Sequence, residues 1–326
     1  MSEEQPQLSV LRDASVKDWL MLAALIFIGG SAFVCIKAAV QTAEPAVVSG
    51  VRLWVAALLL CGYAYASGRP LPGLLTVKDG KRQLDRRWRF MLAGGLIGYT
   101  IPFTLFPLAQ QTVDSMLAGI YMAFMPLLTI VMAYFFAREP LTLSRITGFS
   151  LGTIGVIFLI GPAALQGIGS SDVTAQLWLI IANVCYAIYA VMMRWAPEMP
   201  ARTFAAGTLL SSAIFATPLL LISGQDWTAT DSTSWLAMIY LGIMPSGIAA
   251  IVIINLIRKN GAGFMAMANY VTPVVAIVMG MLIYAEPLKP TFLIGLLAIL
   301  AGLAISRSRH LLGPGMGLQK LIRPRK

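Results

Sequence analysis

Charge is scarce in this sequence of 326 residues. Asp, Glu, Lys and Arg together make up 12% of it, whereas 58% of the residues are hydrophobic. A soluble domain averages roughly 25% charged residues, so a fold in water would leave too much apolar surface uncovered. This composition excludes an ordinary soluble protein and indicates that lipid is the solvent.

Histidine, a phosphate-binding loop and carboxylates in the middle of apolar runs are also lacking. The single histidine, His310, lies near the C-terminus, which removes histidine-based metal sites and acid–base catalysis from the membrane. The G-x-x-x-x-G-K-[ST] pattern is absent, so ATP does not drive this chain directly. The three cysteines all fall in apolar runs, and their odd number argues against a disulfide framework. We therefore predict that the chain is not an enzyme and has no catalytic residue, metal or cofactor.

Long apolar runs dominate the sequence instead. A helix needs roughly 20 residues to cross a bilayer core, and these runs are too long and uniform for the alternating strands of a membrane barrel. Ten runs are free of charged residues: 19–36, 53–68, 90–113, 115–137, 146–171, 173–193, 203–225, 232–257, 260–285 and 290–306. They predict an all-α integral membrane protein with ten transmembrane helices.

The basic residues collect on alternate loops. One side of the membrane, which includes both termini, receives 21 of the 24 Lys and Arg residues, whereas the other side receives only Lys37, Arg52 and Lys289. The positive-inside rule places the basic side in the cytoplasm. We therefore expect a multi-pass protein of the cell inner (plasma) membrane with both termini cytoplasmic. Membrane topology accounts for the net charge of +10, so no nucleic acid partner is predicted.

One segment of the sequence is repeated. Residues 125–158 align with 272–305 without a gap, and nine positions are identical, including a Glu-Pro-Leu triplet and two glycines. Each copy closes a set of five helices, and because five is odd, the second set enters the membrane from the opposite face. This predicts two inverted repeats around a shared central cavity. The predicted domains are an N-terminal cytoplasmic segment (1–17), two five-helix repeats (18–163 and 164–306) and a basic cytoplasmic tail (307–326).

Helix-breaking residues occur at corresponding places in the two repeats. Proline removes a backbone donor and frees a carbonyl, which membranes tolerate only where protein or a wet cavity satisfies that carbonyl. Such interruptions indicate a transport site, although kinks that merely help the helices to pack are the alternative. The helix-break and gating candidates are Pro102, Pro126, Pro245, Pro273, Glu139 and Glu286.

Two five-helix halves, each closing with Pro…Glu-Pro-Leu…Gly…Gly, resemble the EamA-type permeases of the drug/metabolite transporter superfamily. The resemblance covers residues 19–306 and implies that helices 1, 3, 4, 6, 8 and 9 line the cavity. It sets helices 5 and 10 aside, as do the glycine faces of these two helices, which are typical of close packing. The Glu-Pro elements fall on Glu139-Pro140 and Glu286-Pro287. There each glutamate either has a structural role, as a cap or as the partner of a neighbouring basic group, or contributes to a gate.

Polar residues inside the apolar runs are the candidates for the cavity. Arg52 lies about 10 Å into the second helix, where it could bind a substrate anion, pair with Glu44 or Glu286, or extend to the headgroups. Lys37, at the end of the first helix, either extends likewise or joins the site. Hydrogen bonds between helices and the interfacial aromatic belt are the alternatives for the remaining candidates. These are Tyr99, Tyr121, Asn183, Tyr186, Tyr189, Asn255, Asn269 and Tyr270.

These observations predict a secondary transporter of a small polar or amphipathic metabolite that works by alternating access. An amino-acid-like or similarly anionic solute suits the candidate residues, and the resemblance favours efflux. The alternatives are a membrane channel and an intramembrane enzyme acting on lipid-linked substrates. The expected partners are a small-molecule substrate and membrane lipids, with monomer and homodimer both open. Substrate identity and the coupling ion stay open as well.

Overall fold

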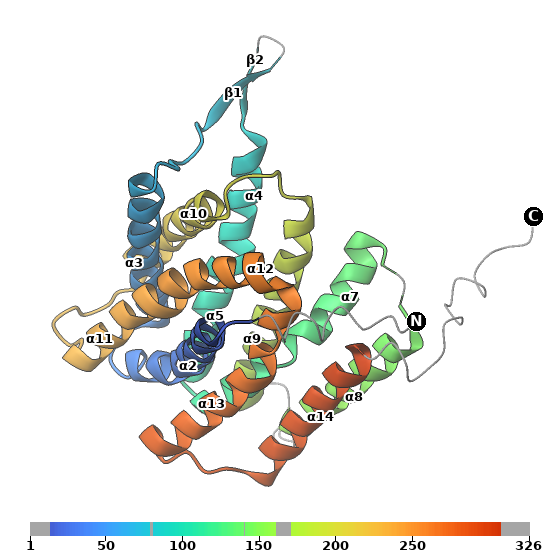
Figure 1. Cartoon of the computed structure of the whole chain (residues 1–326). Helices are drawn as coiled ribbons and strands as arrows, with labels where there is room; N and C mark the ends of the chain where they lie inside the picture. Colours follow the sequence, from blue (N-terminus) through green and yellow to red (C-terminus); the bar gives the residue numbers. More distant parts are fainter. Residues whose placement is uncertain (1–13, 79–80, 140, 161–170, 308–326) are drawn as a thin grey trace, which may run out of the picture.

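The structure of the protein, a computed structural model, describes residues 14–78, 81–139, 141–160 and 171–307. Most of the predicted N-terminal segment, the predicted boundary at residues 163 and 164, Pro140 and the tail beyond residue 307 lie outside the described residues. The described part is helical apart from one hairpin and the connecting turns (Figure 1).

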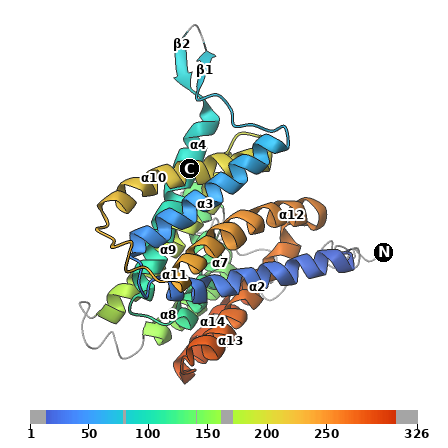
Figure 2. The ribbon, with the colours of Figure 1, turned by 90° about the vertical axis from the view of Figure 1, so that its left-hand side faces the viewer.

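The described residues of the first half form seven α-helices and one π-helical segment. A basic β-hairpin, absent from the all-helical prediction, projects from the bundle between α3 (Pro45–Ala66) and α4 (Arg86–Gly94) (Figures 1 and 2). The elements in chain order are α2 (Val16–Ala39), α3 (Pro45–Ala66), β1 (Leu75–Lys78), β2 (Lys81–Leu84), α4 (Arg86–Gly94), η1 (Gly95–Thr100), α5 (Ile101–Gln110), α6 (Ser115–Met122), α7 (Met125–Ala137) and α8 (Leu143–Ile160).

The second half has the same order of helices and lacks a described hairpin. Its elements are α9 (Ser171–Met192), η3 (Met193–Trp195), α10 (Ala201–Ile222), α11 (Ser232–Leu241), η4 (Gly242–Ile248), α12 (Ala249–Ala266), α13 (Ala268–Tyr284) and α14 (Pro290–Arg307). The two halves interleave: α2 contacts α13, α3 contacts α10, α5 contacts α9, and α8 contacts α14. The bundle therefore has one shared interior rather than two separate ones.

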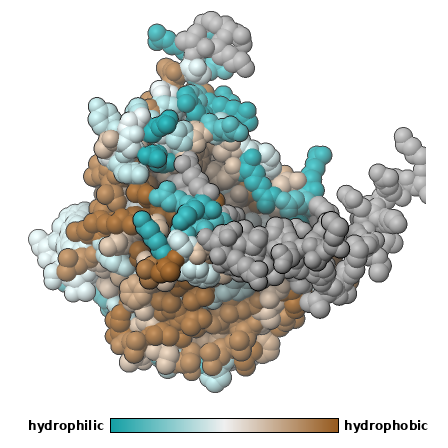
Figure 3. Space-filling view, viewed as in Figure 1, coloured by the Kyte–Doolittle hydropathy of each residue, from teal (hydrophilic) through white to brown (hydrophobic). Residues whose placement is uncertain are grey.

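Eight helices of the described residues are long and apolar enough to cross a membrane, and two shorter apolar helices, Ala268–Tyr284 and Pro290–Ser306, follow them. Large apolar side chains lie on the outside of this bundle; Leu221 is 77% exposed and Leu282 is 79% exposed. Figure 3 shows hydrophobic residues covering the lower part of one face, away from the hairpin. Such a surface is stable in lipid and costly in water, so the protein is a multi-pass membrane protein.

Local sequence explains where several helices begin. Ser15 and Asp18 form a capping box at the start of α2, in which the Ser15 Oγ accepts from Asp18 N–H and Asp18 Oδ2 accepts from Ser15 N–H. Pro45 begins α3, where its missing N–H costs nothing. Asp231 precedes α11 and accepts from Ser234 N–H at 2.8 Å.

The two halves repeat their irregular features at a separation of 147 residues. The π-helical segments begin at Gly95 and at Gly242. The helices that precede the Glu-Pro elements both end in a left-handed residue, Arg138 (φ 54°) and Ala285 (φ 50°). After each, the glutamate N–H donates back to a carbonyl six residues earlier, that of Ala133 or Gly280, which satisfies one carbonyl of the last turn of the helix. The sequence repeat is therefore also a repeat of backbone geometry.

Glycine allows α8 and α14 to lie against each other, side by side in Figure 1. A Cβ atom placed on Gly155 would lie 2.7 Å from the carbonyl oxygen of Gly295, and Gly148 and Gly302 meet in the same way. Backbone contact of this kind requires glycine on both helices. The pair stands beside the central bundle, and neither helix contributes to the cavity described next.

Candidate functional site

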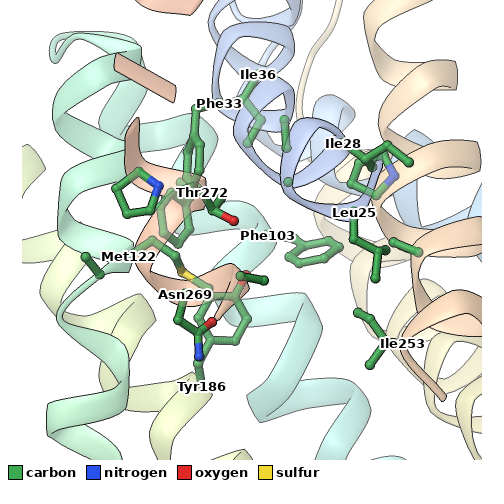
Figure 4. Close-up of a pocket in the computed structure, with 18 of the residues that line it drawn as sticks. Leu25, Ile28, Phe33, Ile36, Phe103, Met122, Tyr186, Ile253, Asn269 and Thr272 are labelled. Atoms are coloured by element: carbon green, nitrogen blue, oxygen red, sulfur yellow. The ribbon is translucent and has the colours of Figure 1, made fainter. Parts of the chain in front are cut away.

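A cavity of about 330 Å³ lies inside the bundle (Figure 4). Both halves of the chain line it: α2, α3, α5 and α6 from the first half, and α9, η4, α12 and α13 from the second. The volume falls in the range of pockets that bind small molecules, roughly 300–1,000 Å³. The helices around it are those of spans 1, 3, 4, 6, 8 and 9, together with one residue, Arg52, from span 2.

Most of the lining is apolar. In Figure 4 Phe103 projects toward the middle of the cavity, with Leu25 and Ile253 on one side and Met122 on the other. Phe33, Phe106 and Ile36 extend the same surface. A ligand seated here loses water from most of its surface, so it needs a substantial apolar body.

Arg52 is the only charged residue among the described lining residues. Its side chain is buried, with the residue only 6% exposed. The Nε–H donates to Ser246 Oγ at 2.8 Å, and the guanidinium carbon lies 3.7 Å from the centroid of the Phe103 ring. A cation stacked on an aromatic face is attracted to the ring quadrupole. These contacts hold the guanidinium in one orientation.

Ser246, which holds Arg52, lies in the π-helical segment η4. The Ser246 hydroxyl donates its single proton to the Leu241 carbonyl at 2.8 Å, so its oxygen is left to accept from Arg52. In η1 the Thr100 hydroxyl likewise donates to a backbone carbonyl, that of Gly95, at 3.0 Å. Hydroxyl side chains therefore satisfy carbonyls next to the irregular turns, as a membrane interior requires.

Three of the ten predicted cavity residues meet in this lining: Arg52, Tyr186 and Asn269. In the view of Figure 4 the side chains of Asn269 and Tyr186 are drawn below that of Phe103. Thr272, one turn further along α13, is the other polar contributor with a labelled side chain. Arg52 pairs with neither Glu44 nor Glu286, the two partners that the sequence left open, because Glu44 is exposed and Glu286 binds elsewhere.

The other seven candidates lie outside the lining, and several have structural partners. Lys37 Nζ donates to the carbonyls of Gln110 and Val113 at 3.0 and 3.1 Å, which caps the end of α5. Tyr121 donates to Gln176 at 2.7 Å, and Asn183 donates to the Leu179 carbonyl on its own helix. The Tyr99 ring packs edge to face against the rings of both Tyr189 and Phe103. Asn255 and Tyr270 complete the seven.

Of the four prolines predicted to break helices, two line the cavity and two do not. Pro245 and Pro273 line the cavity, the former inside η4 and the latter inside α13. Pro102 and Pro126 instead lie near the starts of α5 and α7, just after an irregular turn. The first half therefore breaks its fourth span at residues 123 and 124, whereas the corresponding stretch of α13 is continuous.

The two Glu-Pro glutamates differ in environment although their backbones match. Glu286 is 7% exposed and caps α6, since its carboxylate accepts from Ser115 N–H, Ser115 Oγ–H and Met116 N–H at 2.8–2.9 Å. Glu139 is partly exposed and pairs with Arg194 and Arg145. The hydrogen bond from Arg194 lowers the pKa of the Glu139 carboxyl below its ordinary value, with Arg145 adding to the effect.

The sequence did not single out most of the lining. Phe33, Phe106 and Met122 resemble any other apolar residue in a span, so composition carries no signal for them. Ser246 and Thr272 had a usable signal, since each is a hydroxyl residue next to a mid-span proline, Pro245 and Pro273. A hydroxyl beside a mid-span proline is well placed to satisfy a freed carbonyl.

The fold defines a multi-pass helical membrane protein with an internal cavity. The sequence profile of the EamA-like transporter family matches residues 17–161 and, a second time, residues 173–308. These matches cover most of the chain, which therefore belongs to the EamA-like transporter family and is a membrane transporter. The family and the names of the relatives point to transport and not to an enzyme.

Several curated proteins align over most of this chain. The inner membrane transporter YedA of Escherichia coli K12, named as uncharacterized, is 28% identical over 79% of this chain and 80% of its own length. YvbV of Bacillus subtilis, also named an uncharacterized transporter, is 24% identical over 89% and 91%. A WAT1-related chloroplastic protein of Arabidopsis thaliana is 25% identical over 85% of this chain, which spans 66% of that protein. One solved crystal structure aligns with a TM-score of 0.62 at 20% identity, over 91% of this chain and all of that chain, and supports the fold alone.

Proposed function

We propose that this protein is a secondary carrier that moves a small polar or amphipathic metabolite across the inner membrane by alternating access. The observation that carries the proposal is the cavity lined by both halves of the chain. A site between two repeats can be exposed to either side when one repeat moves against the other. Amino-acid-like solutes and related anions are the substrates expected, and efflux is the favoured direction.

The proposal includes ten spans in two inverted repeats, 18–163 and 164–306, with both termini in the cytoplasm. The eight long apolar helices and the two shorter ones support a count of ten crossings. The repeated π-helical segments and left-handed turns support the duplication. Five crossings per repeat, together with basic loops on the hairpin side, support the inversion and the orientation.

One end of the bundle is tied across the repeats. Glu286 of the second repeat caps α6 of the first, and the Thr42 hydroxyl donates to Ser234 Oγ at 2.9 Å. These bonds lie on the side that the charge pattern places outside the cell. The cavity lining runs along α2 from Leu25 to Ile36 and includes Ile253 of α12. The bonds at the outer end support a carrier that is closed outside, so that its cavity opens toward the cytoplasm.

Reconstitution in liposomes tests the function. Liposomes loaded with a metabolite mixture should show saturable flux, and substrate on the opposite side should accelerate it. Protein-free liposomes give the background rate, and a Gly62→Ala variant is a matched control because this exposed glycine has open space around it. A channel would give flux without acceleration by substrate on the opposite side. Flux that neither saturates nor responds to opposite-side substrate would contradict the carrier.

A further inference from the structure

The charge in the cavity has no counter-charge among the described residues that line it. Arg52 is buried, and none of the described lining residues is acidic. The carboxylates in the described ion pairs belong to Asp18, Asp85 and Glu139, each with a different basic partner. A buried cation without a partner carries a desolvation cost of several kcal/mol, which a bound anion would offset.

The guanidinium is also presented in a form that suits one anionic group. Its Nε is occupied by Ser246 and its flat face by Phe103. The structure gives the two terminal amino groups no hydrogen bond to any described residue, and this edge of the guanidinium binds carboxylates through two parallel bonds. A lysine in the same place would offer a point charge without this fork.

The remaining lining offers little to a second charge. Its polar atoms, on Tyr186, Asn269 and Thr272, are neutral. An ammonium group would therefore lose its hydration without meeting a carboxylate, and it would share a small cavity with the Arg52 cation. Burial of a charge without a partner is costly, so both cations and zwitterions are disfavoured.

We propose that the substrate is a singly charged organic anion: one carboxylate held by Arg52, and an apolar body, aliphatic or aromatic, seated against Phe103 and the apolar lining. Ser246 is a positioning residue that orients the guanidinium. This inference rests on the proposed carrier function and narrows its substrate class to carboxylates without an ammonium group.

Four probes that share one phenylpropyl-sized body but differ in charge test the proposal. They are 3-phenylpropionate (anion), 3-phenylpropionamide (neutral), 3-phenylpropylamine (cation) and phenylalanine (zwitterion). Binding to the purified full-length protein is measured by calorimetry and by the shift in unfolding temperature at neutral pH. The anion should bind, and each other probe should bind at least about 30-fold more weakly, the factor that corresponds to removing one partner of a buried charge pair.

Variants then assign the preference to Arg52. Arg52→Gln should weaken binding of the anion by at least about 30-fold and leave the amide unchanged. Arg52→Lys should recover part of the loss, which a purely structural role would not predict. Ser246→Ala should weaken the anion by a smaller factor. Lys289→Gln, at an exposed cation outside the cavity, is the matched control and should bind like the wild type.

The outcomes separate the substrate class from the function. The class is overturned if the amine or the zwitterion binds as well as the anion, if no probe binds, or if folded Arg52→Lys and Ser246→Ala proteins bind the anion like the wild type. Exchange of phenylalanine or the amine across liposomes would then leave the carrier standing with another substrate. The carrier itself fails only if a broad metabolite mixture shows no saturable, trans-stimulated flux.

Discussion

Removal of the Glu286 carboxylate should loosen the end of the bundle at which the two repeats are tied. The group is buried and accepts three hydrogen bonds, two of them from the backbone N–H groups of Ser115 and Met116. Glu286→Ala leaves these donors buried at the start of α6 without an acceptor. Each unsatisfied buried group costs about 1–3 kcal/mol, and loss of a helix cap costs about 1 kcal/mol. Because the terms overlap, we expect a loss of about 2–4 kcal/mol.

The repeat supplies a matched control. Glu139 occupies the equivalent position with the same left-handed turn before it, but it is partly exposed and pairs with two arginines. Exposed ion pairs contribute below about 1 kcal/mol, so Glu139→Ala should be much milder than Glu286→Ala. Gly280→Ala gives a second test, because its Cβ would lie against the Glu286 carboxylate and 3.1 Å from Ser115 Oγ.

The assay is reversible unfolding in mixed micelles, followed by tryptophan fluorescence, with stabilities of all three variants compared at one pH. A Gly280→Ala/Glu286→Ala double variant should lose less than the sum of the single losses, since both changes disrupt one contact. Equal losses for Glu286→Ala and Glu139→Ala, or simple additivity in the double variant, would refute the assignment of Glu286 as the cap of α6.

Three further predictions follow from single contacts. Gly155→Val should destabilise the protein by at least about 2 kcal/mol by forcing α8 from α14, whereas Gly62→Ala, in open space, should not destabilise it; micelle unfolding compares the two. Lys37→Met should cost about 1–2 kcal/mol through the lost cap of α5 without changing the affinity for 3-phenylpropionate, and a change in that affinity would place Lys37 in the site. Arg194 lowers the folded-state pKa of Glu139 from 4.5, so the ionised carboxylate stabilises the folded protein above that pH, and this stabilisation is lost as pH falls through the folded-state pKa. The unfolding temperatures of the wild type and Glu139→Gln should therefore differ near pH 7 and converge in acid. A difference that widens in acid would contradict a lowered pKa.

The membrane class, most spans and the duplication were predictable because they depend on patterns that lipid enforces. Uncharged runs of about 20 residues have few alternatives to a spanning helix, and Glu-Pro-Leu recurs in register with the glycines. Backbone detail was not predictable. The left-handed residues Arg138 and Ala285 are not glycines, so their residue types gave no indication of this backbone conformation. The π-helical segments at Gly95 and Gly242 likewise lack a sequence signature.

The cavity was predictable only in part: three of the ten polar candidates, Arg52, Tyr186 and Asn269, line it. Arg52 is a cation inside an apolar run, which must face the interior or a headgroup. Tyrosine and asparagine have more options, because a single hydrogen bond to a neighbouring helix satisfies them. Tyr121 and Asn183 took that option with Gln176 and the Leu179 carbonyl. Whether a polar residue lines the cavity depends on the direction in which its side chain points from the helix. A span that is apolar on all sides gives no sequence signal for that direction.

Thiol accessibility at Asn269 tests whether exposure of the cavity alternates between the two sides of the membrane. Replacement of the three free cysteines, Cys35, Cys61 and Cys185, gives a background in which Asn269→Cys is labelled by a membrane-impermeant maleimide from either side. A carrier closed at its outer end should be labelled from the cytoplasmic side alone. When Glu286→Gln loosens the outer tie, labelling from outside should appear and labelling from inside should decrease. Labelling at equal rates from both sides in the unmodified background, or from neither side in both proteins, would contradict a carrier that alternates around this cavity.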